Sequence, residues 1–345
     1  MKNELNQDYV VHVLKELLLT PSPSGYCHGI MEKVKKKIEN LGFTMEYTQK
    51  GCGIVTVPGK DPGSTLGLSA HVDTLGAMVR SIKSSGMIRF TPIGGYMMPT
   101  VEGEYCQIHT RCGKSFSGTV LSTQPSVHVY ADARKLERSE ENMEIRIDEL
   151  VSSKEDVEAL GIGVGDFISF DPRTVVMENG FVKSRHLDDK AGVAILLGLL
   201  EYFHRTGVKP SCTLKVFISV YEEIGHGSSY LPEDIDELIA IDMGAMGDDL
   251  TCTEQDVSIC VKDSSGPYDY HMVSRLQQLA KEQGLSYTMD VYPYYGSDVS
   301  AALRGGNNIK GALIGPGVHA SHGMERTHMN GIMNTLALLK AYIIV

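Results

Sequence analysis

Apolar residues near the N-terminus recur at the spacing of one helical face. They are Val10, Val11, Val13, Leu14, Leu17 and Leu18. The proline-rich segment at residues 20–25 would end this helix. A second helix is expected from Gly29 to Leu41. Two apolar runs, Gly53–Val57 and Thr65–Ala70, then predict short strands.

The pattern changes between about residues 76 and 174. Helical periodicity is weak there, and short strand-forming runs alternate with glycine-rich turns. The runs are Gly86–Thr91, Tyr105–Thr110, Ser126–Tyr130, Glu144–Ile147 and Asp166–Phe170. We therefore expect a β domain at residues 76–174, inserted into a discontinuous domain made of residues 1–75 and 175–345.

Strands and helices alternate again after residue 175. Helices are expected at Gly192–Tyr202, His271–Gln283 and Asn330–Ile344, and strands at Cys212–Val220, Leu238–Ile241 and Lys310–Ile314. This alternation is typical of βαβ units. It predicts an α/β fold, with a mostly parallel sheet flanked by helices. In such sheets, functional residues gather beyond the carboxyl ends of the strands.

Composition and charge narrow the class of protein. The chain has 345 residues, which suggests about two domains. Lys and Arg total 32 and Asp and Glu total 43, so the formal net charge of −11 argues against a nucleic-acid partner. No apolar run approaches the ~18 residues of a membrane helix, and the N-terminus lacks a signal-peptide pattern. Seven cysteines without a CxxC pair favour a reducing cytoplasm.

Five groups of polar residues stand out: four follow expected strands, and one precedes an expected helix. They are His71 and Asp73, Asp188 and Asp189, Glu222 and Glu223, Asp242, and finally His319 and His322. Taken singly, several have a structural explanation, because an aspartate before a helix can act as its cap. Adjacent glutamates at the end of a buried strand are harder to explain in that way. One of them can bind a metal while the other acts as a general base.

Together these residues suggest a metal site at one edge of the sheet. Two histidines and three carboxylates match the nitrogen and oxygen ligands of a dinuclear zinc, cobalt or manganese centre. Asp73 could accept the second N–H of the His71 ring and fix its orientation. A competing nucleophile is not evident, since the sequence has no Gly-x-Ser-x-Gly motif.

The ordered set of motifs resembles the co-catalytic dimetal aminopeptidases. The long gap between His71 and Asp188, which contains the β domain, resembles metallopeptidase family forty-two: the glutamyl, deblocking and tetrahedral aminopeptidases. The resemblance implies that Asp188 bridges two ions. His71 and Asp242 would then complete the ligands of one ion, and Glu223 and His322 those of the other. Glu222 would be the general base.

The resemblance also implies supporting roles and an assembly. Asp73 would orient His71, and Asp189 would lie beside the bridging carboxylate. The inserted domain would be a small β-barrel involved in oligomerisation and access, and the family suggests a dodecamer. Three departures stand out: Lys190 replaces an arginine, residues 295–298 read Tyr-Gly-Ser-Asp where the family has Gly-Thr-Asp, and the last motif leaves His319 as a rival to His322.

The motifs and the resemblance predict a cytoplasmic aminopeptidase that removes N-terminal residues from peptides, and the resemblance implies that it is a homo-oligomer. It would use water bridged by two divalent ions, zinc first, with cobalt and manganese as alternatives. The main rival is a dimetal amidohydrolase or deacylase acting on an N-acyl or amide-bonded small molecule. More remote are a glycosidase, which neighbouring Glu222 and Glu223 suit poorly, and a metal-stabilised scaffold, which needs no base such as Glu222. Side-chain specificity stays open.

Overall fold

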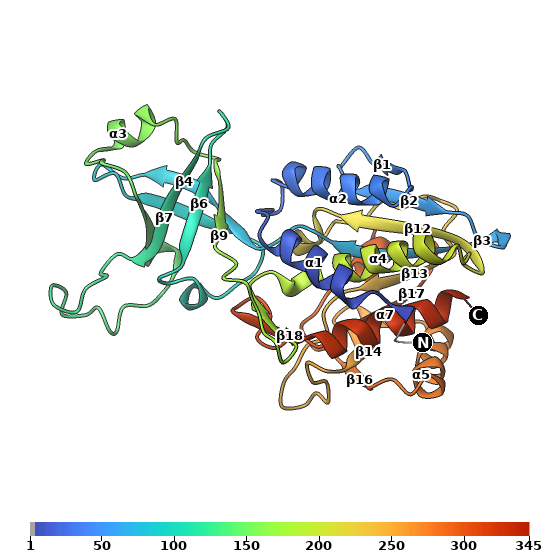
Figure 1. Ribbon diagram of the computed structural model, residues 1–345. Coiled ribbons are helices and arrows are strands. Elements are labelled where there is room, and N and C mark those ends of the chain that lie inside the picture. Colours follow the sequence, from blue (N-terminus) through green and yellow to red (C-terminus); the bar gives the residue numbers. More distant parts are fainter. Residues whose placement is uncertain (1–3, 345) are drawn as a thin grey trace.

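A mixed β-sheet runs through the larger part of the molecule (Figure 1). In the computed structural model, which describes residues 4–344, its strands are β1 (Met45–Tyr47), β2 (Gly53–Val57), β3 (Asp61–His71), β12 (Cys212–Ser219), β13 (Glu237–Ile241), β14 (Val257–Asp263), β15 (Gly266–Pro267), β16 (Tyr287–Val291) and β17 (Lys310–Pro316). Their order is β1-β2-β12-β3-β13-β17-β14-β15, and β16 pairs with β14. The central strands β12, β3, β13 and β17 are parallel, so their carboxyl ends meet at one edge.

Helices flank this sheet. They are α1 (Gln7–Leu18), α2 (His28–Asn40), α4 (Leu187–Thr206), α5 (Tyr270–Glu282), α6 (Asp298–Arg304) and α7 (Met329–Ile344). α4 packs on β3 and also contacts α1 and α7. Every residue of α4 from Leu187 to Phe203 is consequently buried. This position explains why its sequence is apolar on nearly all faces rather than on one stripe.

The inserted segment forms a closed barrel (Figure 1). Its strands are β4 (Gly76–Ile82), β5 (Ile88–Ile93), β6 (Tyr105–His109), β7 (Ser115–Ser122), β8 (Met143–Ile147) and β9 (Phe167–Phe170), and a short helix, α3 (Lys154–Ala159), lies beside them. The order β4-β5-β8-β7-β6-β9 closes on itself. The barrel has its own apolar core, which includes Phe90, Ile108 and Ile145. Closure leaves no unpaired strand edge.

A small antiparallel sheet brings the chain that leaves the barrel next to the segment that precedes α7. It consists of β10 (Val175–Val176), β11 (Phe181–Ser184) and β18 (Glu325–His328). Ser184 pairs with Glu325 in this sheet. The pairing places the segment before Asp188 beside the segment after His322, which the sequence separates widely.

The α/β class with an inserted barrel is confirmed. The strand expected at Ser126–Tyr130 was wrong, because these residues form a turn in which the amides of Val129 and Tyr130 both bond to the Ser126 carbonyl. Val127 and Val129 are exposed there, so the β-branched residues do not mark a sheet. Across residues 4–344, none of the helices combines the length and the apolar character needed to span a bilayer.

Candidate functional site

The predicted site residues gather at the carboxyl edge of the parallel strands. His71 is the last residue of β3, and Asp242 directly follows β13. Glu222 and Glu223 lie in a single 3-10 turn just after β12. Asp188 stands at the start of α4, which packs on β3. Since β12, β3 and β13 are parallel neighbours, their ends bring these side chains together.

Asp188 lies between two histidines. Its Oδ1 is 3.2 Å from Nε2 of His71, and its Oδ2 is 3.3 Å from Nε2 of His322. The two carboxylate oxygens therefore face different imidazoles. Nε2 of His322 is also 3.5 Å from Oε2 of Glu223, and Nε2 of His71 is 3.7 Å from Oε2 of Glu222. Donor atoms of His71, Asp188 and Glu223 all lie within 4.8 Å of one another.

A second group is formed by His71, Asp189 and Asp242, whose donor atoms likewise lie within 4.8 Å of one another. Asp189 already accepts two main-chain hydrogen bonds, from His71 N (3.2 Å) and Gly192 N (3.0 Å). Both of its oxygens are thus engaged in holding β3 and the start of α4. Asp189 accordingly suits a supporting position beside Asp188.

The buried carboxyl groups of this cluster favour the binding of cations. Burial, together with nearby carboxylates, raises the pKa values of Glu222, Glu223 and Asp189 well above their ordinary range. Burial and the neighbouring Asp188 charge raise the pKa of Asp242 to about 7. So many buried acids cannot all ionise without cations. Imidazole nitrogens and carboxylate oxygens are a donor set that suits divalent metals such as zinc.

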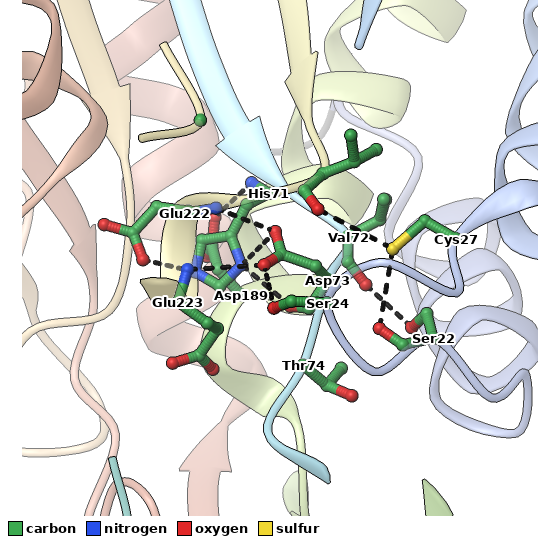
Figure 2. A network of polar contacts seen from close by, with 12 residues as sticks. Ser22, Ser24, Cys27, His71, Val72, Asp73, Thr74, Asp189, Glu222 and Glu223 are labelled. Carbon is green, nitrogen blue, oxygen red and sulfur yellow. Dashed lines mark hydrogen bonds and ion pairs between the residues drawn. The ribbon is translucent and has the colours of Figure 1, made fainter. Parts of the chain in front are cut away.

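Asp73 connects the N-terminal segment to the turn that carries Glu222 (Figure 2). Its fully buried carboxylate accepts hydrogen bonds from the amides of Glu222 (3.1 Å) and Glu223 (3.3 Å). Ser24 Oγ donates to the same carboxylate at 2.5 Å. Nδ1 of His71 is nearer to the Asp73 carbonyl (2.9 Å) than to its carboxylate (3.5 Å). The main-chain oxygen is therefore the closer partner of the ring, and the carboxylate mainly holds the glutamate turn.

The structure brings His322, and not its rival, to the cluster. His319 is exposed, and its main chain pairs with Arg326. Buried Glu325 accepts the His322 amide with one oxygen (3.1 Å) and the Asp188 amide with the other (3.2 Å). One carboxylate therefore fixes the backbone of two site residues that are far apart in the sequence.

A cavity of about 510 Å³ opens beside the cluster. Its lining includes Asp188, Glu222, Glu223, Asp242 and His322, together with Met243, Ala245, Leu250, Tyr292, Tyr294, Tyr295, Gly296, Ser297 and Arg304. The Tyr295 hydroxyl donates to the Met243 carbonyl (3.0 Å), and Arg304 donates to Ser265 Oγ (2.8 Å). This volume is typical of sites that hold a small molecule or part of a peptide.

Several residues at the site were not predicted from the sequence. Ser24 lies in a segment whose prolines indicated only the end of a helix, and Arg304 ends the short helix that follows the Tyr-Gly-Ser-Asp segment. Of the Tyr-Gly-Ser-Asp segment, Ser297 caps α6, while Asp298 accepts the amide of Ser228 (3.0 Å). Asp298 therefore supports the loop that follows the two glutamates rather than lining the cavity.

Comparisons with known proteins identify the family of this chain and relatives of its fold. The sequence profile of the M42 glutamyl aminopeptidases matches residues 51–338. YhfE of Bacillus subtilis, whose name carries a provisional aminopeptidase assignment, is 48% identical over 334 residues, which is 96% of each chain. The aminopeptidase APDkam598 from the archaeon Desulfurococcus kamchatkensis has a similar structure (TM-score 0.88, 22% identity, 98% of this chain and 95% of that one).

A further solved structure, the TET1 peptidase of Pyrococcus horikoshii, matches with a TM-score of 0.85 and 22% identity over 97% of this chain and 99% of that one. At this identity the likeness concerns the fold. The profile match and the Bacillus relative cover most of the chain and confirm the family that the order of the motifs indicated. The chain therefore belongs to the M42 glutamyl aminopeptidase family, whose members are metal-dependent peptide hydrolases.

Proposed function

We propose that this protein is an aminopeptidase with a centre for two divalent cations, of which zinc is the first candidate. Asp188 would bridge the ions. His71 and Asp242 would hold one of them, and Glu223 and His322 the other. The observation that carries this assignment is the placing of Asp188, whose two oxygens lie 3.2 Å and 3.3 Å from the Nε2 atoms of two different histidines.

When bound, two such ions would polarise the peptide carbonyl and make a water molecule acidic enough to attack at neutral pH. The protein must supply the groups that hold the substrate and move protons. Glu222 is our candidate for the general base. It would accept a proton from the attacking water and pass it to the nitrogen of the leaving peptide.

The environment of Glu222 supports this role. The Asp73 carboxylate accepts a hydrogen bond from the Glu222 amide at 3.1 Å. Glu222 also lines the cavity. Burial raises the pKa of its carboxyl group well above the ordinary value. Bound cations would counter part of this rise, and the side chain would remain placed to take a proton from water in the cavity and to pass it on.

The cavity next to the cluster would receive the first residue of the peptide. Its walls include Leu250, Tyr292 and Tyr295, and Arg304 adds a guanidinium group. A carboxylate-bearing first residue would pair with that cation. We therefore expect glutamate and aspartate to be preferred at the peptide N-terminus.

We extend the proposal to the domains and the assembly. Residues 1–75 and 175–345 would form the catalytic domain, and residues 76–174 a domain for oligomerisation and access. The TET1 peptidase of Pyrococcus horikoshii assembles into a tetrahedron or an octahedral shell, which supports a large homo-oligomer here. Seven free cysteines support a reducing cytoplasm as the location.

A peptide panel tests the proposed activity. The purified chain is stripped of metal, reloaded with zinc, cobalt or manganese, and given peptides beginning with Glu, Leu or Lys beside N-acetylated copies. We expect metal-dependent release of single N-terminal residues, fastest from the Glu peptide, and no cleavage of the acetylated copies. Cleavage of the acetylated compounds alone would contradict the proposal and favour a dimetal amidohydrolase.

A further inference from the structure

The inserted barrel touches the site directly. Residues 94–104, here called the rim segment, connect β5 to β6 and include a 3-10 turn at Met98–Thr100. The carbonyl oxygen of Gly95 in this segment lies 2.5 Å from Nδ1 of His322. Nε2 of the same ring faces Asp188 and Glu223. A carbonyl on the far nitrogen of a metal-binding histidine fixes its tautomer and its orientation.

Arg185 holds the two partners of this contact together. It lies between β11 and α4 and is only 5% exposed. Its guanidinium donates to the carbonyl of Thr100 in the rim segment and to the carbonyl of Gly323 (3.2 Å), the residue after His322. It also lies 3.3 Å from Oε1 of Glu104 at the end of the rim segment. A planar fork with several donors can make such contacts at once.

Arg173 offers a natural comparison. Its guanidinium pairs with the same oxygen of Glu104 at 2.8 Å, but its side chain is 61% exposed. Within residues 4–344 it lacks the bonds that Arg185 makes to Thr100 and Gly323. The two arginines therefore share a carboxylate partner and differ in whether they reach the His322 loop.

We propose that Arg185 is a positioning residue that couples the inserted barrel to the metal centre. By clamping the rim segment against the His322 loop, it keeps the Gly95 carbonyl on the His322 ring. The barrel thereby completes one of the two metal positions. This inference rests on the proposed function, because it takes His322 as a metal ligand there.

The contacts of Arg185 link the barrel to only one of the two proposed metal positions. The affinity for the ion held by Glu223 and His322 should fall when the Arg185 side chain is removed. Binding of the ion held by His71 and Asp242 should not weaken, because His71 is the last residue of β3 and Asp242 directly follows β13, both in the central sheet. A purely structural arginine would instead lower overall stability and affect both positions alike.

The test is zinc binding to the metal-free full-length chain, measured by competition with a chelator. Wild type should bind two zinc ions per chain. In Arg185→Ala, one ion should keep wild-type affinity and the other should bind about 10–100-fold more weakly, as expected when a partner of a metal ligand is lost. Arg173→Ala should behave like wild type. Arg185→Lys should fall between, since one ammonium group cannot replace the fork.

A double mutant shows whether Arg185 acts through His322. His322→Ala should weaken the same single ion, and adding Arg185→Ala should weaken it little further. Hydrogen exchange in the metal-free protein supplies a second readout, with faster exchange at residues 94–104 and 320–324 in Arg185→Ala but not in Arg173→Ala. If Arg185→Ala does not fold, Arg185→Lys carries the test with the same predicted direction.

The outcomes separate this inference from the proposed function. A wild-type chain that binds no zinc would overturn both. Two zinc ions in wild type, with unchanged affinities in Arg185→Ala and Arg185→Lys, would overturn the inference alone. Equal weakening of both ions, or additive losses in the double mutant, would also overturn it.

Discussion

Two adjacent glutamates face different partners at the site. Oε2 of Glu222 lies 3.7 Å from Nε2 of His71, whereas Oε2 of Glu223 lies 3.5 Å from Nε2 of His322. This divergence fits a division of labour in which Glu223 binds metal and Glu222 handles protons. The residue pattern alone indicated the pair, and only the family resemblance assigned the two roles, because a tight turn rather than an extended strand sets the directions of the side chains.

We expect Glu222→Gln to retain both metal ions and to lose turnover. The amide keeps the shape of the side chain but cannot accept the proton, and loss of a general base typically lowers kcat by about 10²–10⁴-fold. Steady-state kinetics and metal content per chain measure the two effects. The exposed Glu233→Gln serves as the control. Near-normal turnover in Glu222→Gln would show that another group is the base.

Ser24→Ala should slow the reaction without emptying the metal site. The Ser24 hydroxyl donates to the Asp73 carboxylate (2.5 Å), and that carboxylate holds the amides of Glu222 and Glu223. Loss of a hydrogen bond to a buried charge is worth about 1.5–3 kcal/mol, so kcat should fall by about tenfold or more. KM should change little.

Ser22→Ala is the matched control for Ser24→Ala. Ser22 is also buried, and its hydroxyl donates to the Val72 carbonyl (2.8 Å) instead of to Asp73. We expect its cost to appear in the unfolding midpoint and not in kcat. Equal losses of kcat in the two variants would mean that Ser24 has no particular effect on the glutamate turn.

Among the secondary-structure elements, α4 depends on a close approach to β13 near the site. A Cβ atom on Gly192 would lie 2.3 Å from the Ile241 carbonyl oxygen and 2.4 Å from Oδ1 of Asp189. We expect Gly192→Ala to lower the free energy of unfolding by about 1–3 kcal/mol and to weaken metal binding, because Asp189 must move. Denaturant unfolding and metal content measure both effects.

Gly29→Ala provides the comparison for that helix glycine. Gly29 lies in α2, and a Cβ there would meet nothing within 4 Å. Alanine favours helix by up to about 1 kcal/mol over glycine, so its stability should be unchanged or higher. If Gly192→Ala were equally harmless, the close packing of α4 on β13 would not be needed to hold Asp189.

Regular elements with a strong apolar pattern were predictable, and the barrel was less so. The pattern located β12, β13, β17 and α7 closely, because burial on both faces or along a whole helix leaves long apolar runs. In the barrel, Val127 and Val129 suggested a strand but lie exposed in a turn. Short barrel strands carry weak alternation, so their pairing depends on contacts distant in sequence.

Across the whole molecule, the barrel also contacts the catalytic part through an aromatic stack. The rings of His109 in β6 and Tyr26 are 4.7 Å apart and nearly parallel, at 21°. His109 is buried, and its ring nitrogens lie 3.1 Å from Ser115 Oγ and 2.8 Å from Ser169 Oγ. Burial, with a smaller effect of His28, lowers the pKa of His109 below its ordinary value of 6.5.

This shift predicts a loss of stability in acid. Below pH 6.5 the unfolded chain takes up a proton at His109 that the folded chain resists, so the contribution is full above that pH and lost as the pH falls below it. We expect the urea midpoint of the metal-free wild type, measured relative to that of His109→Gln at the same pH, to fall between pH 8 and pH 5. An equal drop in both proteins would contradict the assignment.

The sequence allowed the residues of the site to be predicted, but not the contacts that connect them to the barrel. Strand ends pointed to His71, Glu222 and Asp242 because parallel strands share one functional edge. The contacts of Gly95 and Arg185 were not predictable, because a carbonyl oxygen and a lone arginine carry no pattern in the sequence. They arise only when the barrel is placed beside the His322 loop.

The most direct test of the central claim is a titration of the metal-free protein with zinc or cobalt. Release of the first residue from an unblocked peptide is followed by mass spectrometry while the bound metal per chain is measured. A dimetal aminopeptidase should be inactive without metal and should reach full activity at two ions per chain. Full activity in the presence of a strong chelator, or two bound ions without release of any N-terminal residue, would contradict the account.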